Sequence, residues 1–186
     1  MYRAQPSKPR TLAEGIHIAV DEMFKALETS IAGLDDAQLW SQPIEGRHSI
    51  GSILLHVLEN IDRHACYFQV GTWALDREQH ERANFYGKPV ENDPGPIDAL
   101  GVAELSAQVQ TLKAAVSQTL AGITDRDLYS PRFGEQTYWW QEHGRLSIDA
   151  YHRVVWHANA HIRQIWCLRG VMGAVDREHF PRQFWH

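Results

Sequence analysis

Two histidines four residues apart give the first chemical signal in this sequence. His157 and His161 lie in the segment from Val155 to Gln164. On a helix, a spacing of four returns to within about 40° of the same direction, so both imidazoles leave one face, one turn apart. Such a pair can chelate one metal ion, although the alternative is two ordinary residues at a polar edge. The Ala-Asn-Ala between them lacks the Glu of the HExxH metalloproteases.

Two imidazoles leave a tetrahedral or octahedral ion incomplete, so a third ligand from another helix is required. His56 and His64 both lie in the second apolar periodic segment. Periodicity mildly favours His64, which is nearer the centre of the apolar stripe, whereas His56 lies at its margin. However, His157 and His161 are also marginal on their own helix, and a site at the flank of a bundle would favour a marginal third ligand. The residues alone leave this choice open.

Composition restricts the chemistry and the partners. The chain has 186 residues with 11 His but only two Cys, so imidazole must do most of any metal binding. We interpret Cys66 and Cys167 as structural residues. A net charge of −5 and a pI near 6.1 argue against a nucleic-acid partner. Because we find no secretory signal and no run of about 18 apolar residues, we expect a cytoplasmic protein without a membrane span.

Helical periodicity organises the chain into four segments, and strand patterns are almost absent. Thr11 with Glu14 is typical of a capping box, Ser49 and Ser147 are expected N-caps, and a glycine follows most segments. The expected helices cover about 11–34, 49–70, 97–121 and 147–170. We therefore predict an all-α four-helix bundle, formed as one domain over residues 1–186.

The segments between and beyond these helices are unequal. Connections 73–96 and 123–146 each exceed 20 residues, so we expect them to cross the bundle or to cover a site. Tyr138, Trp139 and Trp140 in the second connection could line an apolar pocket, or could pack in the core or at a dimer surface. Residues 1–10 form an N-terminal extension and residues 176–186 a C-terminal tail.

Polar residues beside the candidate ligands could support them. Glu59 lies three residues after His56 and is therefore its neighbour on the helix, within reach as a hydrogen-bond acceptor or a proton carrier. The alternative is a solvated surface carboxylate. Asn60 and Gln164 could orient a bound water or an imidazole, or could be ordinary polar residues.

The two motifs together resemble a known family. The segment from Ser49 to Glu59, with His56 in it, is followed about 100 residues later by His157-x-x-x-His161-x-x-Gln164. This pattern resembles the DinB/YfiT-like metalloenzyme superfamily over nearly the whole chain. The resemblance implies an up-down-down-up four-helix bundle, often a homodimer, with a divalent ion on His56, His157 and His161. Members often have the sequence His-Arg-Gly-Gln from the last ligand onward, whereas this chain has His161-Ile-Arg-Gln164, which keeps the Gln but lacks the small residue.

The resemblance also indicates a reaction class. Several characterised relatives are transferases or isomerases that use a low-molecular-weight thiol, so we expect a metal-dependent enzyme of this kind with a small-molecule substrate. The alternatives are a metal-dependent hydrolase and a non-catalytic bundle that binds a ligand or partner. Three neutral imidazoles would suit Zn, Ni, Cu or Fe. A di-iron site would require Glu-x-x-His pairs on helices together with further acidic ligands, and Glu45 and His48, which have this spacing, precede the helix.

Overall fold

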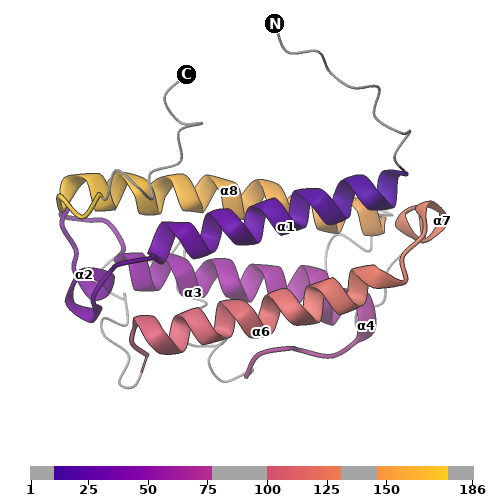
Figure 1. Ribbon diagram of the computed structural model, residues 1–186, viewed down its shortest axis with the longest axis horizontal. Helices are drawn as coiled ribbons and strands as arrows, with labels where there is room; N and C mark the ends of the chain where they lie inside the picture. The colour runs from indigo at the N-terminus through magenta and orange to yellow at the C-terminus, as the bar shows by residue number, and fades with distance from the viewer. Residues whose placement is uncertain (1–10, 77–99, 131–145, 176–186) are drawn as a thin grey trace, which may run out of the picture.

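The protein is built from helices packed side by side. The structure, a computed structural model, describes residues 11–76, 100–130 and 146–175, and these ranges contain no β-strand. Its long helical segments lie alongside one another (Figure 1). They are α1 (Leu12–Ile31), α3 (Ile50–Ile61) with its continuation, α6 (Val102–Ala121) and α8 (Ser147–Val171). The all-α prediction is confirmed.

Most helix ends follow the capping signals of the sequence. Thr11 and Glu14 form the expected capping box of α1, and the Ser49 side chain accepts a hydrogen bond from the backbone N–H of Ser52. Two expected starts were wrong. The third long helix begins at Val102 rather than near 97, and the N-cap of α8 is Leu146 rather than Ser147.

The predicted helix 49–70 is not a uniform α-helix. After α3 the chain forms a π-helix, η1 (Asp62–Tyr67), and a final turn, α4 (Phe68–Val70), which ends at Gly71 with φ of 78°. The buried Asp62 carboxylate accepts hydrogen bonds from the backbone N–H groups of Ala74 at 2.9 Å and Leu75 at 2.8 Å. The chain that leaves the helix is therefore tied back against it.

Two short helices that the sequence pattern did not predict cap the long ones. Within α2 (Asp36–Trp40), the Asp36 carboxylate accepts from the Val102 N–H at 2.8 Å, at the start of α6. Within α7 (Asp125–Leu128), Asp125 accepts from the Ala13 N–H at 2.8 Å, at the start of α1. The first N–H groups of a helix have no partner within it and carry partial positive charge, so carboxylates stabilise both ends.

The long helices enclose one apolar core. α8 packs against α1 and α3, and α6 packs against the same two helices. Figure 1 shows that α3 and α8 run in opposite directions. At one end of the bundle, the buried Arg169 guanidinium donates hydrogen bonds to the backbone carbonyls of Ser30 and Ala32. These bonds cap the C-terminus of α1. Fully buried residues come from every long helix, among them Phe24, Leu27, Leu54, Leu58, Leu105, Leu112, Tyr151 and Ile165.

Several sequence predictions fall outside the described residues. These are the extension 1–10, the tail 176–186, most of the two long connections, and the Tyr138, Trp139 and Trp140 cluster. Among the helices that the structure describes, none combines the length and the apolar character needed to cross a bilayer.

The contact between α2 and α3 leaves no room for a side chain at Gly51. A Cβ there would lie 2.7 Å from ring carbons of Trp40. The same indole donates a hydrogen bond from Nε1 to the Leu100 carbonyl at 3.0 Å, so it cannot shift freely. The short α2 helix therefore depends on a glycine at this position.

We predict that Gly51→Ala lowers the free energy of unfolding by about 1–3 kcal/mol, because the added methyl overpacks the contact with Trp40. The matched control is Gly15→Ala in α1, where a Cβ would meet nothing within 4 Å. That change should raise stability by up to about 1 kcal/mol through helix propensity. Urea unfolding monitored by circular dichroism measures both, and equal effects would contradict the close packing.

Candidate metal centre

Three histidine side chains from two antiparallel helices meet inside the bundle. His56 comes from α3, and His157 and His161 come from α8. The Nε2 atom of His157 lies 3.1 Å from Nε2 of His56 and 3.2 Å from Nε2 of His161. One ring nitrogen from each residue lies within 4.8 Å of the other two. The structure therefore brings together the three histidines that the resemblance implied as ligands.

The spacing of these nitrogens suits a shared ion. Two imidazole nitrogens at about 2.0–2.1 Å from one tetrahedral ion are about 3.3 Å apart, close to the two observed distances. Among the residues that the structure describes, no fourth His, Cys, Asp or Glu joins the group. The three imidazoles thus fit a site that leaves part of the coordination sphere for another molecule.

Gln164 fixes the hydrogen position on one of the rings. Its Oε1 lies 2.7 Å from Nδ1 of His161. An amide oxygen can only accept, so Nδ1 is the donor and the lone pair of the neutral ring lies on Nε2, which faces the other two histidines. Gln164 was predicted as a possible orienting residue, and in the structure its side chain is in hydrogen-bond contact with His161.

Hydrogen bonds among the three rings cannot satisfy all of their Nε2 atoms. Nε2 of His157 can carry one hydrogen, yet it faces two other nitrogens, so at least one lone pair meets another or shares a poorly aligned hydrogen bond. A shared cation would engage all three lone pairs at once. On its other side, Nδ1 of His157 is buried without a hydrogen-bond partner among the described residues. The orientation of this ring therefore rests on the cluster.

The environment keeps the rings uncharged. Burial, followed by the neighbouring His157 and His161, lowers the pKa of His56 to about 3. Burial and the neighbouring His161 lower the pKa of His157 to about 4. Burial also lowers the pKa of His161, against the raising effect of its bond to Gln164. All three are neutral at pH 7, and neutral imidazole is the form that binds metal.

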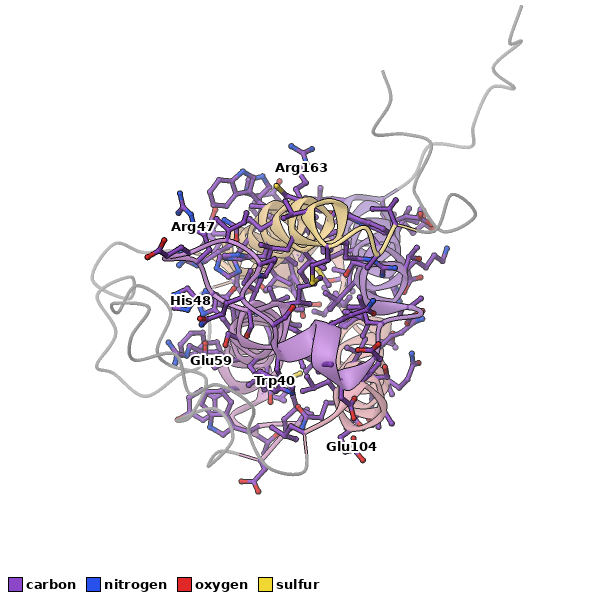
Figure 2. The ribbon with its side chains drawn as sticks, turned by 90° about the vertical axis from the view of Figure 1, so that its left-hand side faces the viewer. Trp40, Arg47, His48, Glu59, Glu104 and Arg163 are labelled. Carbon is purple, nitrogen blue, oxygen red and sulfur yellow. The ribbon has the colours of Figure 1, made fainter. Side chains whose placement is uncertain are left out.

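Glu59 is not a solvated surface residue. It is only 4% exposed and forms an ion pair with Arg63, one turn further along the helix. Figure 2, which looks along the bundle, shows Glu59 and His48 on the same flank. The neighbouring Asn60 is also buried, and its Oδ1 has no hydrogen-bond partner within the described ranges. The helix that supplies His56 therefore carries further polar groups toward its C-terminus.

His64, the competing third ligand, lies elsewhere. It is 2% exposed, in the π-helix, and its ring packs edge-on against Phe68 with centroids 5.2 Å apart. Burial, with Arg153 and Arg63 nearby, lowers its pKa well below the ordinary value. Periodicity correctly placed His64 deeper in the apolar face, but it is not in the three-histidine group.

Two arginines near the site were missed from the sequence. Arg63 and Arg153 each contribute to the lowered pKa values of the histidines around them. Arg63 could have been found from its spacing of four from Glu59, which is typical of a helical ion pair. Arg153 is four residues before His157, but a lone arginine on a helix is usually solvated, so no signal distinguished it.

Helical bundle proteins commonly place metal sites between facing helices, and the three-histidine cluster between α3 and α8 is compatible with such a site. The family model of the DinB superfamily matches residues 19–165, a span that runs from α1 into α8 and includes all three histidines and Gln164. The chain belongs to the DinB superfamily, which confirms the resemblance. No match was found among curated proteins.

We predict that Gln164→Leu weakens metal affinity about 10- to 100-fold, because His161 loses the acceptor that holds its Nδ1 hydrogen. Gln164→Glu keeps an acceptor at that position and should bind metal at least as tightly as the wild type. Competition titration against a chromophoric chelator measures both. A leucine variant that binds as tightly as the wild type would remove Gln164 from the site.

Proposed function

We propose that this protein is a metal-dependent enzyme in which His56, His157 and His161 hold one divalent ion. The observation that carries the proposal is the convergence of three neutral imidazole nitrogens, 3.1 and 3.2 Å apart at the two shorter contacts. Nitrogen ligands suit Zn, Ni, Cu and Fe alike, so the proposal names the site and not the element.

With three protein ligands, the ion would keep room for an exogenous molecule. When bound, a divalent cation on uncharged ligands supplies Lewis-acid chemistry that activates a nucleophile near neutral pH. The chain's own residues hold this arrangement: Gln164 orients His161, and burial keeps the rings unprotonated. Glu59, whose carboxylate pairs with Arg63, suits the role of a hydrogen-bond acceptor near His56.

For the reaction, we propose thiol-dependent transferase or isomerase chemistry on a small-molecule substrate. In the transferase case the sulfur of a low-molecular-weight thiol bonds to an electrophilic carbon, and the leaving group departs with its electron pair and takes up the thiol proton. The chain does not bring its own sulfur to the histidines: neither Cys66, which is buried elsewhere, nor the exposed Cys167 is in their group. This supports a thiol from outside.

The order of the four long helices, which the family resemblance implies, belongs to the same proposal. The opposite course of α3 and α8 supports an up-down-down-up order of the four long helices. The homodimer and the cytoplasmic location stay predictions.

The thiol proposal is tested with a matched pair of probes, N-acetylcysteine and N-acetylserine, which differ only in sulfur and oxygen. A ligand of the native state raises its melting temperature by mass action. We expect N-acetylcysteine, but not N-acetylserine, to raise the melting temperature of the metal-loaded wild type.

The control is the His157→Ala variant, in which neither probe should have an effect. No shift in the loaded wild type, or an equal shift with both probes, would contradict thiol chemistry and favour hydrolysis or simple ligand binding. An equal shift with N-acetylcysteine in His157→Ala would place the thiol away from the metal.

A further inference from the structure

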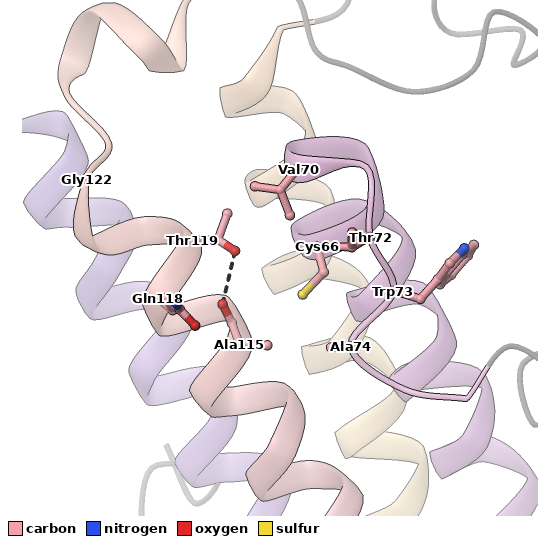
Figure 3. A pocket seen from close by; sticks show the side chains of 9 residues that line it. All are labelled: Cys66, Val70, Thr72, Trp73, Ala74, Ala115, Gln118, Thr119 and Gly122. Carbon is pink, nitrogen blue, oxygen red and sulfur yellow. Dashed lines mark hydrogen bonds between the residues drawn. The ribbon is translucent and has the colours of Figure 1, made fainter.

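A cavity lies away from the three histidines, beside the helical segment that continues α3. It has a volume of about 460 Å³ and lies between η1, the turn that follows α4, and the C-terminal half of α6 (Figure 3). No histidine of the metal centre lines it. Its lining consists of Cys66, Val70, Thr72, Trp73, Ala74, Ala115, Gln118, Thr119 and Gly122.

Among the described residues that line this cavity, none has a charged side chain. Cys66 is buried at its base, with Ala74 and Ala115 beside it, so the inner part is apolar. The outer part is mixed: Val70 is 57% exposed and points toward Thr119 (Figure 3). The Thr119 hydroxyl donates to the Ala115 carbonyl at 3.0 Å, which leaves its oxygen able to accept a hydrogen bond.

The wall formed by residues 72–75 is anchored. The Asp62 carboxylate holds the backbone N–H groups of Ala74 and Leu75. The Trp73 ring stacks on Tyr67, with centroids 4.6 Å apart and planes at 17°, and points away from α6 in Figure 3. These contacts hold the cavity open before any ligand arrives, as is usual for small-molecule sites.

The thiol at the base stays neutral. Burial, followed by the charge of Asp62 and a hydrogen bond to it, raises the pKa of the Cys66 thiol far above its ordinary value. Cys66 therefore contributes polarizable apolar surface rather than a nucleophile or a metal ligand.

We propose that this cavity is a second binding site, which takes an uncharged small molecule with an apolar body and one hydroxyl or carbonyl group. The apolar body lies against Cys66, Ala74 and Ala115, and the polar group lies at the mouth near Thr119 and Gln118. A volume of 460 Å³ is within the range of small-molecule sites. An anionic ligand would lose hydration without gaining a cationic partner among the described lining residues, so it is disfavoured.

Phenol and benzoate form a matched pair of probes, one uncharged and one ionised at pH 7. We expect phenol to cause saturable shifts in the amide NMR signals of Cys66, Ala74 and Gly122 of the full chain. Benzoate should bind there at least about tenfold more weakly, because its charge finds no partner. Benzoate shifts confined to His56, His157 and His161 would report the metal centre and would not count.

Two variants on α6 test the location. Ala115→Leu fills the cavity and should weaken phenol binding about tenfold, whereas Ala114→Leu, on the exposed face of the same helix, should leave it unchanged. If Ala115→Leu does not fold, Val70→Ser at the exposed rim replaces it, with about threefold weaker binding expected. Non-saturating shifts, equal binding of benzoate, or full binding by the cavity variants would overturn the proposal.

Discussion

The close approach of three imidazole nitrogens between α3 and α8 is the interaction on which the site depends. Nitrogens 3.1–3.2 Å apart in a buried region cannot all be protonated, because like charges and burial both oppose it. They cannot all be satisfied by hydrogen bonds among themselves either, since Nε2 of His157 carries either one hydrogen or one lone pair and faces two other nitrogens. Three imidazoles this close together are therefore unfavourable without a shared partner, and they are well placed to bind one metal ion. Gln164 adds direction by fixing the hydrogen of His161 on the far side of its ring.

The fold supplies this approach by holding two antiparallel helices in register. The α8 helix carries its two histidines one turn apart, and α3 must present His56 at the same height and on the facing side. Capping by Asp36 and Asp125 fixes where α6 and α1 begin, and the buried Arg169 fixes where α1 ends. These polar contacts at the ends set the positions of the helices along their axes, while the apolar core sets their separation.

Much of this could be predicted from local signals. The spacing of His157 and His161, the capping box at Thr11 and the glycine at 71 depend on residues close together in sequence. The choice between His56 and His64 could not be made in this way, because it depends on how α3 faces α8. Periodicity measures burial, and His64 is indeed more buried than His56. The histidine in the cluster is nevertheless His56. The π-helix depends on tertiary contacts in the same manner, whereas the Glu59–Arg63 pair follows from a local spacing of four residues.

The central claim is that His56, and not His64, completes the metal site. The most direct measurement is an equilibrium titration of tag-free, metal-free protein with zinc, comparing wild type, His56→Ala and His64→Ala, each first shown to be folded. The structure predicts one ion per chain for the wild type, a loss of affinity of more than about 100-fold for His56→Ala, and tight binding retained by His64→Ala. Tight binding by His56→Ala together with loss in His64→Ala would contradict this account.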